Sequence, residues 1–153
     1  MKKVLLAIDN TQGSLKAAET LVRLFPCVKP ETVIVLYVEK LEGFSLMDDA
    51  LLSVSEMNEL KESLKGTDYQ SKLDEKAKKV TDHFVGFLKE NGISGVQPVV
   101  KQGHPADEIL ETASDGVELI VLGARDSSRH GLLMGSISRE VVNRSEIPVL
   151  IAK

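Results

Sequence analysis

The sequence predicts an α/β fold built on a parallel sheet, because short apolar runs alternate with longer amphipathic stretches along the chain. The runs Val4–Ile8 and Thr32–Val38 are continuously apolar or β-branched, as is typical of strands covered on both faces. Between such runs, apolar residues recur every three or four positions, as in helices that bury one face. The 153 residues suit a single domain, 1–153, with one sizeable core.

The N-terminal part of the chain predicts a strand, a turn, a helix and a second strand. The first strand, Val4–Ile8, runs into the turn-forming segment Asp9–Ser14, in which Thr11 is a candidate N-cap. The following helix has apolar residues at helical spacing: Leu15, Ala18, Leu21, Val22 and Phe25. Pro26 and Pro30 flank its exit, and Thr32–Val38 forms the second strand.

The middle of the chain changes to mixed charge with scattered apolar residues, which predicts two amphipathic helices. The first carries the stripe Leu46, Met47, Ala50, Leu51, Val54, Met57, Leu60 and Leu64, and is interrupted at Gly66 and Thr67. This stripe fits either a buried helix face or a lid or docking surface. The second helix begins near Asp68, ends at Asn91–Gly92, and uses Leu73, Ala77, Val80, Phe84, Phe87 and Leu88.

The C-terminal part predicts three further strands: Val96–Val100, Glu118–Leu122 and Ile147–Ala152. A helix beginning at Pro105 and another over Arg139–Arg144 connect them. If the strand order is 3-2-1-4-5, the winding reverses between the first and fourth strands, and ligands in such sheets bind at that reversal. The loops there are Asp9–Gly13 and Gly123–Gly135.

The most informative stretch runs from Glu118 to Ser138, where a buried strand ends at Gly123 and Gly135–Ser136 opens a helix. Glycine permits close backbone approach, and the N-terminus of a helix favours anions, so this arrangement predicts a phosphate-bearing ligand. Arg125 and Arg129 can add charged donors there. Arg129 and His130 are better explained as solvent-exposed loop residues than as phosphate contacts.

Composition argues against several classes of function. A formal net charge of -4, a pI near 5.4, only 4% aromatic residues and no tryptophan disfavour a general nucleic-acid binder. No apolar run approaches the roughly 20 residues of a membrane span, and the N-terminus is interpreted as a strand rather than a signal peptide. Cys27 is the single cysteine, which suits a cytoplasmic location.

Metal and hydrolase chemistry also lack support in the sequence. His83, His104 and His130 show no metal-ligand spacing, so no metal site is expected. Ser136 and Ser138 do not stand in a Gly-x-Ser-x-Gly elbow, so no nucleophilic hydrolase is indicated.

Several segments together resemble the universal stress protein family along the whole chain. They are VLLAIDNTQGSLKAA, in which Asp9, Thr11, Ser14 and Ala17 fit the family pattern, then VKQGHPADEIL, ELIVLGAR and GSISREVVNRSEIPVLIAK. The resemblance implies a five-stranded parallel sheet of order 3-2-1-4-5 in a Rossmann-like layout, as in adenine nucleotide alpha hydrolase-like folds. It also implies a homodimer that pairs through the last strand, residues 148–153, and a subclass that binds ATP.

The ATP-binding subclass has Gly, two residues, Gly, nine residues, then Gly followed by Ser or Thr. Gly123 matches the first glycine and Gly135–Ser136 matches the last pair, but Asp126 replaces the middle glycine. The spacer Ser127–Met134 is also one residue short. Both departures weigh against tight triphosphate binding. The Asp126 carboxylate would either repel phosphate or help hold a magnesium ion.

The candidate nucleotide-binding residues follow from the cradle and from the resemblance. Asp9 and Val38 correspond to the adenine and ribose end, although Asp9 also suits a turn or cap and Val38 also suits the core. Gly103 is either a close-approach position or a simple turn glycine. The complete set is Ala7, Asp9, Val38, Gly103, Gly123, Arg125, Asp126, Gly135, Ser136, Ile137 and Ser138.

These expectations favour a stress-response or signalling module that binds ATP or AMP weakly, with magnesium, and has a protein partner the sequence does not identify. The alternative is a nucleotide-independent dimer that acts through protein contacts and has a degenerate phosphate loop. Slow ATP hydrolysis is the least favoured function, because it needs a positioned water and charge stabilisation, and no convincing base stands out.

Overall fold

The computed structural model describes residues 1–40, 68–124 and 134–153. Its strands are β1 (Lys3–Ile8), β2 (Thr32–Glu39), β3 (Val96–Gln102), β4 (Leu119–Gly123) and β5 (Val149–Ala152). Its helices are α1 (Gln12–Leu24), α3 (Asp68–Glu90), α4 (Pro105–Ala113) and α5 (Ser136–Arg144). The amphipathic stripe expected at 46–64 lies outside the described residues.

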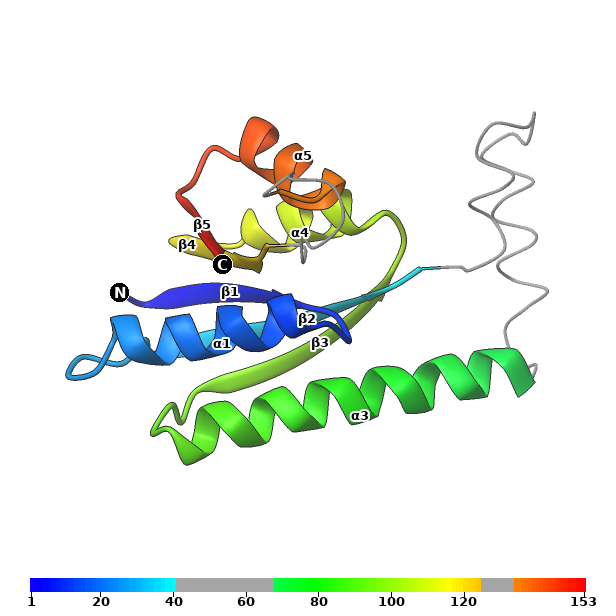
Figure 1. Cartoon of the computed structure of the whole chain (residues 1–153), viewed down its shortest axis with the longest axis horizontal. Helices are drawn as coiled ribbons and strands as arrows, with labels where there is room; N and C mark the ends of the chain where they lie inside the picture. Colours follow the sequence, from blue (N-terminus) through cyan, green and yellow to red (C-terminus); the bar gives the residue numbers. More distant parts are fainter. Residues whose placement is uncertain (41–67, 125–133) are drawn as a thin grey trace.

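The strands form one parallel sheet in the order β3-β2-β1-β4-β5, which confirms the predicted α/β class and strand order (Figure 1). In register, Leu5 of β1 lies between Ile34 of β2 and Ile120 of β4. Helices α1 and α3 cover one face of the sheet, and α4 and α5 cover the other. The chain reverses its winding between β1 and β4, where a crevice at the carboxyl ends is expected.

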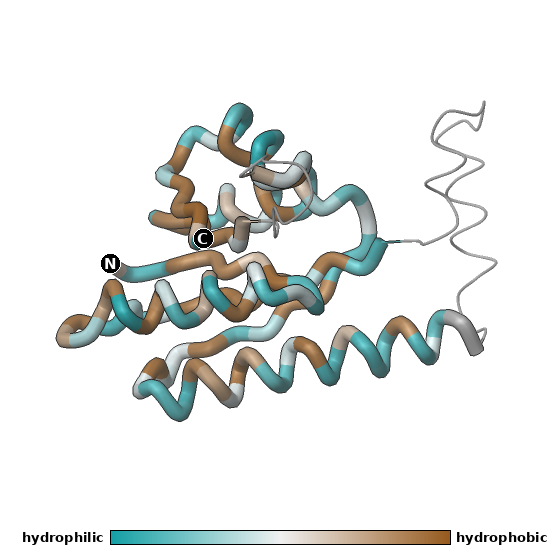
Figure 2. Tube along the Cα trace, viewed as in Figure 1, coloured by the Kyte–Doolittle hydropathy of each residue, from teal (hydrophilic) through white to brown (hydrophobic). Residues whose placement is uncertain are grey.

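Each face of the sheet has its own buried cluster, because successive residues of a strand point to opposite faces. Val4, Leu6 and Val35 pack with α1 and α3, whereas Leu5 and Leu36 pack with α4 and α5. Figure 2 shows the same division, with hydrophobic strands in the middle and helices that are hydrophobic on one side. The three central strands are therefore apolar on both faces, as their continuous apolar runs predict.

Local boundaries differ from the sequence expectation in ways that matter for the site. Helix α5 begins at Ser136 rather than Arg139, so Gly135 is its N-cap and Ser136–Ser138 form its first turn. Thr11 is the N-cap of α1, as expected, but its side chain caps no backbone N–H. Its hydroxyl donates a short hydrogen bond to Asp9 Oδ1 instead.

The two outer strands, β3 and β5, each pair on one side only. Pro98 is accommodated in β3, where a missing N–H costs least. Across residues 1–40, 68–124 and 134–153, no helix combines the length and apolar character needed to cross a membrane.

Candidate functional site

A cavity of about 560 Å³ opens at the carboxyl ends of β1, β2 and β4. The N-termini of α1, α4 and α5 surround it, so three helix ends meet at the reversal of the sheet winding. Its described lining comprises Ala7, Ile8, Asp9, Thr11, Gln12, Gly13, Ser14, Leu36, Val38, Lys40, Pro105, Ile109, Leu122, Gly123, Ala124, Gly135, Ser136, Ile137 and Ser138. The volume lies within the range of pockets that hold small organic ligands.

The cavity combines an apolar part with a polar part. Ala7, Leu36, Val38, Ile109 and Leu122 supply carbon surface from the strands and α4. The polar lining comes from Asp9, Lys40 and the hydroxyl and backbone groups at the starts of α1 and α5. Such a division suits a ligand with a flat apolar portion and an anionic portion.

The turn between β1 and α1 is held together by its own side chains. Ser14 Oγ accepts a hydrogen bond of 2.8 Å from the backbone N–H of Asp9 and donates one of 2.6 Å to Asp9 Oδ1. Ser14 is only 4% exposed. Asp9 therefore orders the turn, as the cap interpretation predicts, and its carboxylate still borders the cavity.

Two glycines bring α1 and β4 into direct backbone contact beneath the cavity. A Cβ on Gly13 would lie 2.5 Å from the carbonyl oxygen of Ala124. A Cβ on Gly123 would lie 2.8 Å from the Gly13 Cα and closer still to its carbonyl group. The packing thus requires glycine at Gly123 independently of any ligand.

The first turn of α5 presents free backbone donors to the cavity. The first bond of its helical ladder runs from the N–H of Arg139 to the carbonyl oxygen of Gly135, at 3.0 Å. The N–H groups of Ser136, Ile137 and Ser138 precede that ladder, and no side chain of the described residues is seen to cap the helix. Together with the helix dipole, these donors favour an anion.

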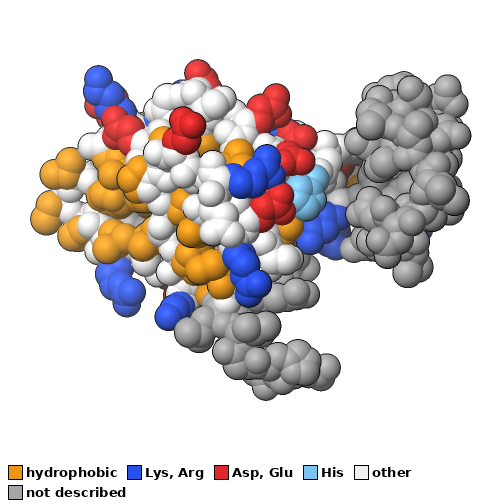
Figure 3. All heavy atoms as spheres, turned by 90° about the horizontal axis from the view of Figure 1, so that it is seen from above, with side chains coloured by type: hydrophobic (Ala, Val, Ile, Leu, Met, Phe, Trp, Pro, Cys, Tyr) orange, Lys and Arg blue, Asp and Glu red, His pale blue; other side chains and the backbone are white. Residues whose placement is uncertain are grey.

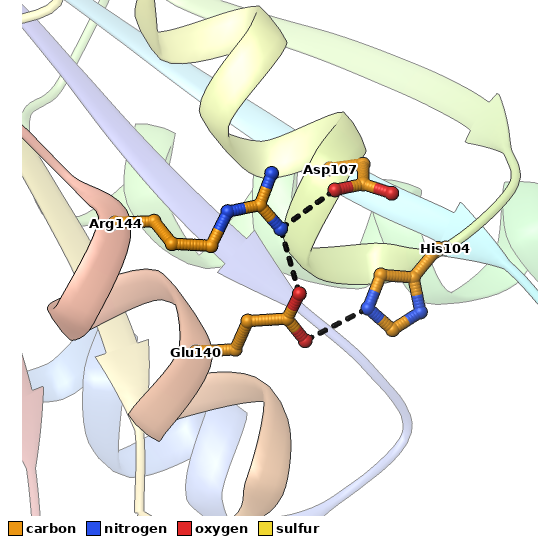
Figure 4. A network of polar contacts seen from close by, with 4 residues as sticks. All are labelled: His104, Asp107, Glu140 and Arg144. Atoms are coloured by element: carbon orange, nitrogen blue, oxygen red, sulfur yellow. Dashed lines mark hydrogen bonds and ion pairs between the residues drawn. The ribbon is translucent and has the colours of Figure 1, made fainter.

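A network of four charged or polar side chains ties α5 to the start of α4 (Figure 4). Glu140 accepts from Arg144 Nη1 at 2.6 Å and contacts His104 Nε2 at 2.8 Å, while Arg144 Nη1 also donates to Asp107 at 2.7 Å. The hydrogen bond with His104, followed by the one from Arg144, lowers the pKa of Glu140. The network fixes α5 against α4 beside the cavity.

The structure brings together most of the residues that the sequence predicted for the site. Among the described candidates, the cavity is lined by Ala7, Asp9, Val38, Gly123, Gly135, Ser136, Ile137 and Ser138. Arg125 and Asp126 lie outside the described residues. Arg129 and His130 also lie outside them.

Gly103 is a described candidate that does not line the cavity. It has φ +149°, and a Cβ there would lie 2.7 Å from Glu108 Oε1. Its N–H donates to the carbonyl oxygen of Glu39 at 3.3 Å, so it joins β3 to α4 beside the end of β2. These features match the turn interpretation of this glycine.

Sequence reasoning missed several residues that line the cavity. Lys40 follows β2 and is a described cation at the cavity, while Pro105 and Ile109 approach from α4. The position of Lys40, directly after a strand end, was the available signal. Nothing local in the sequence places α4 over the cavity, because that requires the strand order.

Metal binding finds no support among the described side chains. In that part of the chain, no three or more His, Cys, Asp or Glu side chains group closely enough to hold a metal ion. The described lining of the cavity consists of helix N-termini, carbon surface, one lysine and one aspartate.

Comparison with known proteins identifies relatives of this chain and of its fold. The universal stress protein MJ0577 of Methanocaldococcus jannaschii is 31% identical over 160 residues, which span 99% of this chain and 94% of the relative. Its solved structure has a TM-score of 0.74 at 28% identity, covering 99% of this chain and 95% of that chain.

Two more distant solved structures share the fold. One is a universal stress protein in complex with cAMP, with a TM-score of 0.66 at 19% identity, covering 99% of this chain and 97% of that chain. The other is a universal stress protein family protein from Arabidopsis thaliana with AMP bound, with a TM-score of 0.62 at 18% identity, covering 100% of this chain and 92% of that chain. The universal stress protein family matches residues 1–153. The chain therefore belongs to the universal stress protein family.

Proposed function

We propose that this protein binds an adenine nucleotide in the cavity at the carboxyl ends of β1, β2 and β4, and acts as a cytoplasmic stress-response or signalling module. The observation that carries the proposal is the first turn of α5, whose N–H groups at Ser136, Ile137 and Ser138 precede the helical ladder and border the cavity. Those donors suit a phosphate. The single cysteine, Cys27, supports the cytoplasmic location.

The other end of the cavity suits the base of the nucleotide. Val38, Leu36 and Ile109 offer carbon surface from β2 and α4, and Asp9 stands at the end of β1. Relatives with the same fold have been solved with cAMP and with AMP. The ligand classes in those structures contain adenine and at least one phosphate, which matches both parts of this cavity.

Calorimetric titration of the whole chain with AMP, cAMP and ATP, each with and without magnesium, tests the proposal. Gly135 has φ -68°, so valine is compatible with its backbone, and Gly135→Val should block the approach to α5 and abolish binding. Gly86→Val is the matched control, because a Cβ at Gly86 meets open space in α3. Unchanged nucleotide affinity in folded Gly135→Val would contradict the proposed site.

The edge strand β5 favours a second function, a nucleotide-independent dimer that acts through protein contacts. Val149, Leu150 and Ile151 are half-buried, and among the strands of residues 1–40, 68–124 and 134–153, β5 pairs with β4 alone. An edge strand of this kind can pair with another chain. Figure 3 shows hydrophobic side chains gathered at the left and lower centre of the face seen from above, with charged side chains above and below them. We propose that a homodimer forms through residues 148–153.

Light scattering tests the dimer. Ile151→Lys should weaken association, because it places a charge on the strand that would pair. Lys89→Gln, at an exposed position of α3 and outside residues 148–153, should leave the mass unchanged. Circular dichroism would verify that both variants are folded. If light scattering showed that the unaltered chain is a stable monomer at high micromolar concentration, the proposed dimer would be refuted. That result would not bear on the proposed nucleotide site.

A further inference from the structure

A second cavity, of about 570 Å³, lies between α1 and α3. These helices run along the same face of the sheet, opposite α4 and α5 (Figure 1). The described lining of this cavity, called here the α1/α3 cavity, is Asp9, Asn10, Thr11, Gln12, Leu15, Lys72, Glu75, Lys76, Lys79, Val80, His83 and Phe84. Most of its residues play no part in the nucleotide cavity.

One stripe of α3 gives this cavity its chemical character. Lys72, Lys76, Lys79 and His83 follow one another at intervals of four, three and four, so they share one face of the helix. The buried stripe Ala77, Thr81, Phe84 and Leu88 has the same spacing. At about 100° per residue, the basic stripe is turned by roughly 140° from the buried stripe, so its side chains are exposed and line the cavity from the solvent side of α3.

The lysines of this stripe outnumber the carboxylates in the same lining. Within residues 1–40, 68–124 and 134–153, no ion pair involves Lys72, Lys76 or Lys79. The acidic lining residues are Glu75 and Asp9, and Asp9 Oδ1 already accepts hydrogen bonds from Thr11 and Ser14. Three lysines against two carboxylates leave one positive charge here, on a chain whose formal net charge is -4.

The remaining lining adds carbon surface and neutral polar groups. Leu15, Val80 and Phe84 belong to the packed interface of α1 and α3 and form the apolar floor. Asn10, Thr11 and Gln12 close the opposite side with amide and hydroxyl groups. A cavity with an apolar floor, a few polar groups and a cationic rim is typical of a ligand site.

We propose that the α1/α3 cavity binds a small polyanion, a compact molecule with two or more phosphate or carboxylate groups, held by Lys72, Lys76 and Lys79. At a rise of 1.5 Å per residue, the Cα atoms of Lys72 and Lys79 are separated by about 10 Å along the helix axis, so separate anionic groups can each meet a lysine. Lysine binds such groups as a point charge on a flexible stem. The volume of about 570 Å³ lies within the range of pockets that hold small molecules.

The proposed site touches the nucleotide cavity through a shared wall. Asp9, Thr11 and Gln12 line both cavities, one on each side of the β1–α1 turn. The two sites are otherwise built from different elements, α3 in one case and β2, β4, α4 and α5 in the other. Binding at one can therefore be removed while the other is kept.

The test titrates the whole chain with pyrophosphate and, separately, with citrate, so that the phosphate and carboxylate sources are distinguished. Amide chemical shifts locate the binding and calorimetry gives the affinity. The double variant Lys76→Gln/Lys79→Gln should weaken binding by about tenfold or more, because each lost contact is charge-assisted. Lys78→Gln/Lys89→Gln is the control: it removes the same charge from exposed positions of α3 that do not line the cavity.

Gly135→Val separates this site from the nucleotide site. Binding of either anion should persist in Gly135→Val, with shift changes along Lys72–His83, even if that variant has lost nucleotide binding. Equal weakening by the two double variants would overturn the proposal, since it would indicate general charge attraction. Failure of both anions to bind, or binding only of an oligoglutamate peptide through Lys76 and Lys79, would also overturn the assignment to a small polyanion.

Discussion

Replacing Gly123 by alanine should force apart two backbone segments that support the nucleotide cavity. The added Cβ would lie 2.8 Å from the Cα of Gly13 and still closer to its carbonyl group. The atoms in the way belong to the main chain at the start of α1, so the movement of a flexible side chain cannot relieve the clash. The reverse contact, from Gly13 to the carbonyl oxygen of Ala124, is equally a backbone contact.

The expected cost follows from what must move. Adding one carbon to a tightly packed site typically costs about 1–3 kcal/mol, and a backbone obstacle places Gly123→Ala near 3 kcal/mol. For a chain of 153 residues, that loss lowers the melting temperature by about 6–12 °C. Separation of α1 from β4 should also weaken nucleotide binding, because both segments line the cavity.

Urea denaturation and calorimetry measure the change, with Gly86→Ala as the control. A Cβ at Gly86 meets nothing within 4 Å in the middle of α3, so this variant should gain about 0.4–1 kcal/mol through helix propensity. The opposite signs expected for two Gly→Ala changes exclude a general effect of removing glycine. Gly123→Ala as stable as the unaltered chain would show that the contact between α1 and β4 is not rigid.

Three further outcomes are expected. Ser14→Ala should cost about 1–3 kcal/mol in urea denaturation, because the Asp9 N–H loses its buried acceptor. Asp126→Gly should strengthen ATP binding or lessen its dependence on magnesium in calorimetry, because a carboxylate near the phosphates opposes an uncompensated triphosphate. The pKa of Glu140 is lowered, so its contribution to stability is present above about pH 4.3 and is lost as pH falls through the lowered pKa. His104→Ala should raise the pKa of Glu140 in a carbon-detected titration. An unchanged pKa would show that the hydrogen bond with His104 is not the main cause of the lowering.

The sheet could be predicted because its signals are local. Val4–Ile8 and Thr32–Val38 are continuous apolar runs, and both become central strands buried on two faces. The exact boundaries of helices were less predictable. Gly135–Ser136 was expected to open the last helix, but its regular part was expected only from Arg139, whereas α5 includes Ser136, Ile137 and Ser138 as its first turn.

The site was predictable where it coincides with strand ends and helix starts. Gly123, Gly135 and Ser136 belong to a strand–loop–helix pattern that can be identified without tertiary information. Lys40 and Ile109 could not be identified, because their approach to the cavity depends on how β2 and α4 are placed in space. The contact between Gly13 and Gly123 joins residues far apart in the chain, and it gives Gly123 a packing role that the loop pattern alone does not reveal.

Two opposing effects meet at the nucleotide cavity, and their balance decides which phosphate chain is favoured. The free N–H groups of Ser136–Ser138 attract an anion through fixed dipoles, whatever the length of the phosphate chain. If Asp126 stands at the phosphate end, as the loop pattern predicts, its charge would oppose a ligand more strongly as the phosphates become more numerous. Without magnesium, the first effect favours both AMP and ATP, and the second disfavours ATP more than AMP. A bridging cation would reduce the second effect alone. A comparison of AMP with ATP therefore separates the contribution of the helix from that of the substituted loop position.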